Sequence, residues 1–211
     1  MSRVQQQLQE RLLRLDSARF ERLIAHLLAR LGYVEVKVLR AEMPGGRRSH
    51  KGRTRHGGMD LMAYSQTDLS RALAVVQVKQ YRRPVARQFV DGLRGAMLRT
   101  EAREGLLITT GPFSRVARTA AASDHIAPLR LVDGAELLNL LVIHQVGVRR
   151  TRKGSYRLDR RFFRRLQAGQ SLHSRHLFDG LSPAKHGSSQ KESERINIET
   201  RTNPTQGGGM T

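Results

Sequence analysis

Residues 74–81, AVVQVKQY, have the composition of a buried β-strand but carry long polar side chains. Side chains alternate between the two faces of a strand, so Gln77 and Lys79 share one face, roughly 6–7 Å apart along the strand. Val76 and Val78 then point to the opposite face. The chain has six lysines against 32 arginines, so Lys79 does not reflect a general use of lysine. We therefore expect the two valines to face the core, and Gln77 and Lys79 to face a substrate.

The segments around this strand alternate between helical and extended patterns. Apolar residues at helical spacing predict helices over residues 1–15 and 17–31, the second with Ser17 as N-cap and Gly32 as its stop. The other predicted elements are strands over 33–39, 59–64, 73–79, 105–110 and 128–133, and helices that open at Pro84, at Ser114 (ending near His125) and at Gly134 (ending at Ile143). This order predicts an α/β fold, in which a mixed β-sheet with a central antiparallel hairpin and a right-handed βαβ end is flanked by helices.

The distribution of charge and apolar residues divides the chain into four expected regions. An N-terminal helical extension, residues 1–16, precedes a folded domain over residues 17–147. Residues 148–178 form a basic, partly helical extension, with ten Arg or Lys and one acidic residue in 148–176. Residues 179–211 are Ser, Gly, Gln, Thr and charged residues with little to bury, so we expect a disordered tail.

Composition points to a polyanionic partner. The formal net charge is +20 and the sequence pI is about 11.6, which favours nucleic acid first and an anionic membrane surface second. Only Phe162, Phe163 and a few aliphatic residues interrupt the charges of 156–166, which disfavours membrane binding. The chain has no cysteine, which excludes disulfides and thiolate metal sites. No apolar run approaches about 18 residues and the N-terminus lacks an apolar signal region, so we expect a cytoplasmic protein.

Asp60 lies in the predicted strand 59–64, which should pair with strand 73–79 as a hairpin. This pairing would bring a carboxylate close to the amide of Gln77 and the ammonium of Lys79. A hard cation such as Mg²⁺ takes oxygen ligands, and it uses one or two carboxylates together with waters. Such an ion polarises a scissile phosphate and lowers the pKa of an attacking water, while a lysine orients that water or balances charge in the transition state. The residues therefore predict a site for phosphodiester hydrolysis.

The pattern alone leaves open that Gln77 and Lys79 only belong to a solvated face of the sheet. Alternation by itself can place a polar residue two positions before a lysine on any half-solvated sheet. Glu35 and Lys37 have the same spacing, and a carboxylate suits a metal better than an amide does. We prefer the pair in 74–81, because a neighbouring strand supplies Asp60 and because the two preceding glycines let the backbone approach a phosphate.

Five motifs follow one another in an order similar to that of a known family. They are FERLIAHLLARLGY, KGRTRHGGMDLMAY, VVQVKQYRRPV, GLLITTGPFSRVARTAA and LRLVDGAELLNLL. Together they span roughly residues 17–142 and resemble the Mrr-like restriction endonucleases of the PD-(D/E)xK nuclease superfamily. This resemblance implies a restriction-endonuclease-like fold. It also implies a Mg²⁺-dependent endonuclease that cuts double-stranded DNA, with Mn²⁺ as an alternative ion.

The resemblance also implies roles for individual residues. Asp60 falls at the family's metal-binding aspartate, and Gln77 and Lys79 fall at its (D/E)xK dyad in the QxK form, so that Asp60 and Gln77 are the implied metal ligands. Glu21 matches a glutamate often found in the first helix. It lies at the edge of that helix's apolar face, where it either reaches the sheet or only solvates the helix flank. Relatives often carry an aspartate where this chain has His56, which weakens any role for that loop.

Basic residues of two segments, together with the basic stretch 149–165, are candidate contacts to the DNA backbone. For the arginines that follow strand 73–79, the alternative is that they only form a solvated basic rim and do not contact DNA. A non-catalytic DNA-binding protein of the nuclease fold is the alternative function, because an amide stands at Gln77. Cutting of both strands would suggest a homodimer, formed through the helix at 1–15. The candidate DNA contacts are Arg47, Arg48, Lys51, Arg53 and Arg55 in the loop, and Arg82, Arg83 and Arg87 after the strand.

Overall fold

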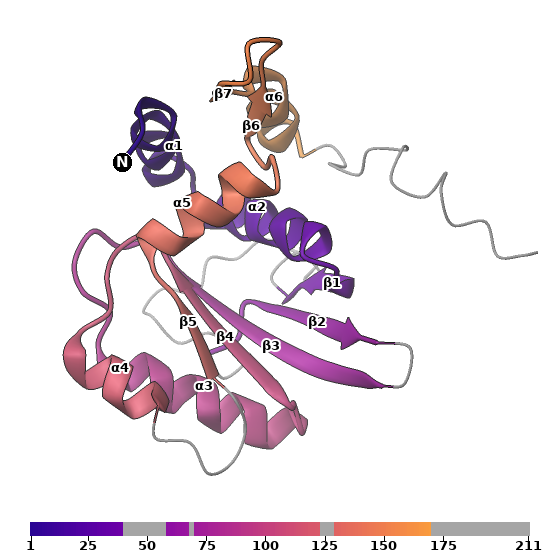
Figure 1. Cartoon of the computed structure of the whole chain (residues 1–211). Helices are drawn as coiled ribbons and strands as arrows, with labels where there is room; N and C mark the ends of the chain where they lie inside the picture. The colour runs from indigo at the N-terminus through magenta and orange to yellow at the C-terminus, as the bar shows by residue number, and fades with distance from the viewer. Residues whose placement is uncertain (40–57, 68–69, 123–128, 170–211) are drawn as a thin grey trace, which may run out of the picture. The chain divides into compact units, whose positions relative to one another are not determined.

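A computed structural model describes residues 1–39, 58–67, 70–122 and 129–169, all of which belong to the compact unit Met1–His173 (Figure 1). The elements, in chain order, are α1 (Arg3–Leu13), α2 (Ser17–Arg30), β1 (Val34–Val38), β2 (Leu61–Gln66), β3 (Arg71–Lys79), α3 (Arg87–Thr100), β4 (Glu104–Thr109), α4 (Arg115–Ala122), β5 (Leu129–Val132), α5 (Gly134–Ile143), β6 (Val148–Arg150), β7 (Tyr156–Leu158) and α6 (Arg160–Gln167). Among the described helices, none is long and apolar enough to cross a membrane.

One mixed sheet forms the centre of the fold, with strand order β1-β2-β3-β4-β5. The pairs β1–β2 and β2–β3 are antiparallel, whereas β3–β4 and β4–β5 are parallel and are connected through α3 and α4. In the hairpin, Leu61 pairs with Val76; on the other side of β3, Lys79 pairs with Thr109 of β4. The predicted mixed sheet, with its central hairpin and βαβ end, is therefore confirmed.

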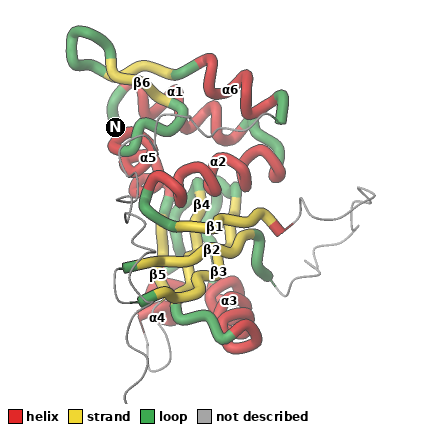
Figure 2. Tube along the Cα trace, turned by 90° about the vertical axis from the view of Figure 1, so that its right-hand side faces the viewer, coloured by secondary structure: helices red, strands yellow, loops and turns green. Residues whose placement is uncertain are grey.

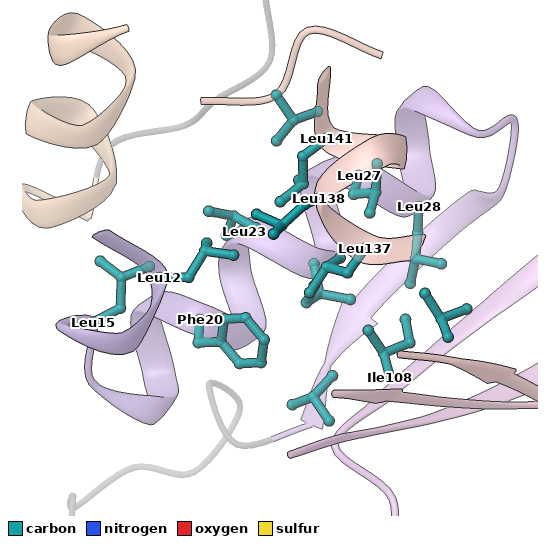
Figure 3. Packing of buried hydrophobic residues seen from close by; sticks show 14 of the residues in the cluster. Leu12, Leu15, Phe20, Leu23, Leu27, Leu28, Ile108, Leu137, Leu138 and Leu141 are labelled. Carbon is teal, nitrogen blue, oxygen red and sulfur yellow. The ribbon is translucent and has the colours of Figure 1, made fainter. Parts of the chain in front are cut away.

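Two helical layers cover the sheet. Helices α2 and α5 lie on one face, and α3 and α4 lie on the other (Figures 1 and 2). Val76 and Val78 belong to the core on the α2 and α5 side, whereas Val75 belongs to the core on the α3 and α4 side. Figure 3 shows leucines of α1, α2 and α5 meeting Ile108 of β4 in the first of these cores. Because both faces are covered, β3 can expose functional groups only near its ends.

The N-terminal helix and the C-terminal extension complete the core on the α2 and α5 side. Leu8 and Leu12 of α1 are at most 1% exposed and share a hydrophobic cluster with Phe163 and Leu166 of α6. The apolar side of α1 is therefore covered within the chain, and the dimer contact expected at this helix stays a prediction. The predicted basic helix begins only at Arg160, because a short antiparallel hairpin of β6 and β7 precedes it.

Two helix starts differ from the predictions. Ser17 is the first residue of α2, and the N-cap is Asp16, whose Oδ1 accepts a hydrogen bond from the backbone N–H of Arg19 at 2.7 Å. Pro84 does not open α3, which begins at Arg87 after the N-cap Ala86. The chain before α3 is extended instead, because Val85 forms a parallel bridge with Phe113 that anchors it beside the end of β4. The helical spacing of apolar residues thus began before the first residue of α3, so the predicted start was three residues too early.

Several predictions concern residues outside the described ranges. They are the glycine- and arginine-rich loop, with Arg47, Arg48, Lys51, Arg53, Arg55 and His56, the end of α4 toward His125, and the tail 179–211. The described part of α4 starts as predicted, after Ser114, whose Oγ accepts a hydrogen bond from the Ala117 N–H at 3.1 Å.

The start of α5 is fixed by Asp133 and by a close backbone contact at Gly134. Burial alone would raise the pKa of the Asp133 carboxyl, but hydrogen bonds from the backbone of Glu136 and Ala135 and from Arg118 hold the pKa below its usual value. A Cβ on Gly134 would overlap the carbonyl oxygen of Thr110. We expect Gly134→Ala to lower the free energy of unfolding by about 2–3 kcal/mol, because the backbone must shift to relieve this overlap.

Chemical denaturation of Gly134→Ala beside Gly92→Ala tests this expectation. A Cβ on Gly92, in the middle of α3, meets no atom within 4 Å. Since alanine is the better helix former, Gly92→Ala should raise stability by about 0.5–1 kcal/mol. Equal effects of the two substitutions would contradict the assignment of Gly134 as a close-packing position.

Candidate active site

Asp60 sits immediately before β2 and is fixed by three hydrogen bonds that involve its own atoms. Its N–H donates to the Val76 carbonyl at 2.9 Å, and its carbonyl accepts from the Leu39 N–H at 3.0 Å. Its Oδ2 accepts from the backbone N–H of Val78 at 2.9 Å, and the residue is only 6% exposed. The regular β2–β3 pairing stops at Leu61. Beyond it, the Asp60 carboxylate, and not a backbone carbonyl of β2, accepts the hydrogen bond from the Val78 N–H of β3. The backbone of β3 therefore orients this carboxylate.

Glu21 reaches the same place from α2. It belongs to the side of α2 that faces the sheet and is 1% exposed, which excludes the interpretation that it only solvates the helix flank. It lines a cavity of about 220 Å³ at the end of β3. The residues around this cavity are Ser17, Phe20, Glu21, Asp60, Val78, Lys79, Gln80 and Tyr81. Glu21 and Asp60 thus bring two carboxylates to this cavity, and carboxylate oxygens are ligands that a divalent cation prefers.

Lys79 is the last residue of β3 and is one of the residues that line the cavity. Its Nζ lies 5.0 Å from the ring centroid of Phe89 on α3, within the range of a cation–π contact. This contact holds the lysine side chain on the α3 side of the strand end. Asp60, Glu21 and Lys79 thus meet around one cavity, although they come from three separate elements.

Gln77 occupies a different position from the one expected. It is 4% exposed and does not line the cavity, although it neighbours Val78 on β3. A Cβ on Gly58 would lie 3.4 Å from Gln77 Nε2, so the amide packs under the glycine turn that leads into Asp60. Its Oε1 is buried and accepts no hydrogen bond within the described part of the chain. An unsatisfied buried acceptor of this kind is costly, and a bound cation or a ligand donor would satisfy it.

The alternative pair on β1 does not form a comparable site. Glu35 is exposed, lies in the left-handed region with φ 49° beside a register shift of β1, and forms an ion pair with Arg71 at 2.7 Å. Lys37 is also exposed. Neither residue lines the cavity that Asp60 and Glu21 share. Of the two pairs, only the β3 pair contributes a residue, Lys79, to this cavity.

Three candidate DNA contacts follow β3 directly. Arg82, Arg83 and Arg87 are all exposed. The guanidinium of Arg83 lies 5.6 Å from the ring centroid of Tyr81, a residue of the cavity wall, and Arg87 forms an exposed ion pair with Asp91. These arginines are thus placed at the end of the strand that carries Lys79, where they can contact phosphates next to the cavity.

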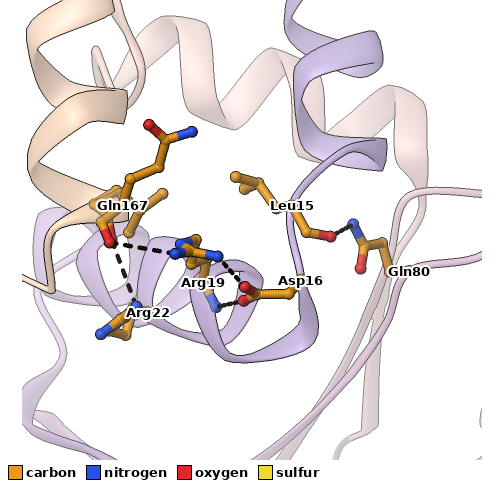
Figure 4. Close-up of polar contacts among 7 residues, drawn as sticks. Leu15, Asp16, Arg19, Arg22, Gln80 and Gln167 are labelled. Carbon is orange, nitrogen blue, oxygen red and sulfur yellow. Dashed lines mark hydrogen bonds and ion pairs between the residues drawn. The ribbon is translucent and has the colours of Figure 1, made fainter.

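Gln80 is a residue of this site that the sequence patterns did not reveal. Its Nε2 donates to the carbonyls of Leu12 and Leu15, at 2.6 and 2.8 Å, and so ties the end of β3 to the turn between α1 and α2 (Figure 4). Asp16 in that turn caps α2 and pairs with Arg19. These contacts fix the start of the helix that carries Glu21. The only signal in the sequence was a second glutamine next to Lys79, which is too weak to assign a role.

The chemistry of these groups suits a divalent cation that keeps several waters. Asp60 and Glu21 bring two carboxylates to a cavity that Lys79 also lines, and Gln77, whose Oε1 has no hydrogen-bond partner among the described residues, lies two positions before Lys79 on the same strand. Among the described residues, no group of three or more His, Cys, Asp or Glu is arranged to hold a metal. Zinc-type coordination by protein ligands alone therefore finds no support there, whereas Mg²⁺ requires only one or two carboxylates.

Comparison with known proteins relates the region around this cavity to restriction enzymes. The family model Mrr_cat, described as "Restriction endonuclease", matches residues 12–141. The type IV methyl-directed restriction enzyme EcoKMrr of Escherichia coli (strain K12) is 33% identical over 142 residues, which are 66% of this chain. The match covers 42% of EcoKMrr, so the chain spans less than half the length of that relative.

A solved structure shows the same fold. The DNA modification-dependent restriction endonuclease AspBHI superposes with a TM-score of 0.50 at 20% sequence identity. The match covers 69% of this chain and 37% of the AspBHI chain. At this level of identity the likeness concerns the arrangement of helices and strands.

Proposed function

Because the chain belongs to the restriction endonuclease family, we propose that it is a Mg²⁺-dependent endonuclease that hydrolyses phosphodiester bonds of double-stranded DNA. One observation carries the proposal: Asp60, Glu21 and Lys79 line a single cavity at the end of β3. Restriction endonucleases generally use divalent metal ions, and the two carboxylates supply the oxygen ligands that such an ion prefers. Mn²⁺ has similar ligand preferences and is the second ion to test.

In this proposal Asp60 and Glu21 hold the cation, and the buried Oε1 of Gln77 is a further candidate ligand. When bound, a divalent cation polarises the scissile phosphate and lowers the pKa of an attacking water. The Val78 N–H keeps the Asp60 carboxylate oriented before any substrate arrives. Such preorganisation avoids the cost of ordering the group during the reaction.

Lys79 supplies the positive charge in this proposal, in which its ammonium orients the attacking water, or stabilises the negative charge that accumulates on the phosphate oxygens in the transition state. The contact with Phe89 limits the side chain to a small region near the end of β3. Arg82, Arg83 and Arg87 contact the DNA backbone beside the cut without reading the sequence. A homodimer would bring two such sites to the two strands.

The second candidate function is a DNA-binding protein that keeps the nuclease fold but does not cut. The amide at Gln77 favours it, since the strand lacks a carboxylate at this position and Gln77 lies outside the cavity wall. Both candidates predict binding to DNA, so binding alone does not distinguish them.

Cleavage of supercoiled plasmid distinguishes the two candidates. We expect the full chain to nick and linearise plasmid with Mg²⁺ or Mn²⁺ and to leave it intact with EDTA, because the carboxylates need a cation to act on phosphate. Methylated and unmethylated plasmids are compared in parallel, which also reports on substrate preference. Binding without any nicking under either ion would favour the non-catalytic candidate.

A further inference from the structure

A second and larger cavity lies outside the candidate active site. It has a volume of about 620 Å³ and is formed by α1, β6, β7 and the start of α6, which lie side by side beyond α2 and α5 (Figures 1 and 2). We call it the arginine groove. The residues that line it are Gln7, Glu10, Arg11, Arg14, Arg149, Arg157, Leu158, Asp159, Arg160, Arg161 and Arg164. Seven arginines thus face two carboxylates, a formal excess of five positive charges.

The charge of the groove is not neutralised within the described part of the chain. None of its seven arginines forms an ion pair with a carboxylate there. Asp159 is engaged elsewhere, because its Oδ1 accepts hydrogen bonds from the backbone N–H groups of Arg161 and Phe162 and caps α6. Concentrated like charge raises the energy of the folded chain, and a bound polyanion relieves that repulsion.

The arginines of the groove stand on a rigid frame. The guanidinium carbon of Arg11 lies 5.2 Å from the ring centroid of Phe163, a residue that is only 3% exposed. A Cβ on Gly147 would lie 2.9 Å from that ring, so the loop before β6 packs closely on it. The Asp159 N–H also donates to the Gly147 carbonyl at 2.9 Å. Binding therefore requires ordering of the arginine side chains but not of the backbone that carries them, which lowers its entropic cost.

We propose that the arginine groove binds the phosphate backbone of double-stranded DNA at a site separate from the cleavage site. Every basic residue of the groove is arginine, whose planar guanidinium forms paired hydrogen bonds with phosphate oxygens. The charges come from four elements, α1, β6, β7 and α6, an arrangement that suits a polymer with regularly spaced phosphates. A membrane would need exposed apolar side chains, but Phe163 and Leu166 of α6 are buried.

The groove and the candidate active site meet at the turn between α1 and α2. Arg14 lines the groove, and the carbonyl of the next residue, Leu15, accepts a hydrogen bond from Gln80, which lines the catalytic cavity. The two sites are therefore linked through this turn, and in our proposal a single duplex contacts both of them. The groove would retain its affinity for DNA even in a chain that does not cut, so the two proposals fail independently.

The test measures DNA binding in EDTA, where no metal-dependent cleavage occurs. The groove variant of the full chain carries Arg157→Gln, Arg160→Gln and Arg164→Gln, and its affinity for a fluorescein-labelled duplex is followed by anisotropy over a range of KCl concentrations. We expect dissociation constants at least about tenfold higher. The slope of log binding constant against log KCl concentration should be less steep by about 2–3, because each lost phosphate contact reduces the magnitude of that slope by about 0.9.

A matched control removes the same charge from the far side of the sheet. It carries Arg99→Gln, Arg103→Gln and Arg115→Gln, three exposed positions in or next to α3 and α4, and should keep the wild-type salt slope. Equal slopes for the groove and control variants would overturn the proposal. Loss of binding to phosphatidylserine vesicles with unchanged DNA binding would overturn it in favour of a membrane surface. If circular dichroism shows that the groove variant is unfolded, Arg149→Gln with Arg161→Gln provides the same comparison.

Discussion

Replacement of Asp60 by asparagine is expected to reduce DNA cleavage by about 10³-fold or more, a loss of about 4 kcal/mol in transition-state stabilisation. Asparagine keeps the shape of the side chain, and its oxygen can still accept the hydrogen bond from the Val78 N–H. The substitution therefore removes charge from the cavity while it preserves the local fold. Plasmid cleavage with Mg²⁺ gives the loss of activity, and anisotropy in EDTA should show unchanged DNA binding.

Glu35→Gln is the matched control for Asp60→Asn. It removes one carboxylate from the same sheet, but Glu35 is exposed and forms an ion pair with Arg71. Exposed ion pairs of this kind contribute little to stability, so its cleavage rate should stay near that of the wild type. Cleavage by Asp60→Asn at the wild-type rate would rule out the proposed cation site, whereas equal losses in both variants would indicate a general effect of charge.

The positions of the apolar residues allowed most of the fold to be predicted from the sequence. Val76 and Val78 alternate with polar residues, and the structure places both in one core, as the period of two requires. The hairpin register follows from the same alternation, since Leu61 must face the side that Val76 faces. The wholly apolar segment at β4 indicated a strand covered on both faces, and it pairs between β3 and β5. Burial dictates these residues, so their pattern is visible in a single sequence.

Other features depended on contacts that a pattern does not contain. The two strands of the β6–β7 hairpin have three residues each, with mostly exposed side chains such as Arg149 and Tyr156, so they show no apolar alternation. The position of the hairpin is set instead by its packing on α1. The start of α3 was misplaced because Val85 is apolar at helical spacing yet is held in an extended bridge by Phe113. In both cases tertiary contacts overrode the local pattern.

The candidate site was predictable in its composition but not in its geometry. The sequence pointed to Asp60 and Lys79, and the structure places both on the cavity wall. It also suggested Gln77 as a partner on the same face, but alternation fixes only the face of a residue and not its depth. The covering of that face by α3 and the turn at Gly58 buries Gln77 away from the cavity. The sequence showed that Glu21 lies at the edge of the apolar face of its helix. The burial of Glu21 could not be predicted, because it depends on the packing of α2 against the sheet.

Removal of the ammonium at position 79 is expected to have the second largest effect. Lys79→Met keeps an unbranched side chain against Phe89, and sulfur makes favourable contacts with aromatic rings, so the fold should persist. The lost charge leaves the developing negative charge on phosphate less stabilised, which should lower the cleavage rate by about 10²–10³-fold. Single-turnover cleavage at saturating protein separates this effect from any change in affinity.

Two further variants decide whether charge or geometry at position 79 matters. Lys79→Arg restores the positive charge as a planar guanidinium, so it should recover only part of the rate. Lys37→Met removes a lysine at the equivalent place in the exposed strand β1 and should cut like the wild type. Since Lys37 lies outside the cavity and Lys79 lines it, a difference between the two methionine variants requires a role tied to the cavity. Full activity of Lys79→Met would instead assign the stabilisation of phosphate to the neighbouring arginines alone.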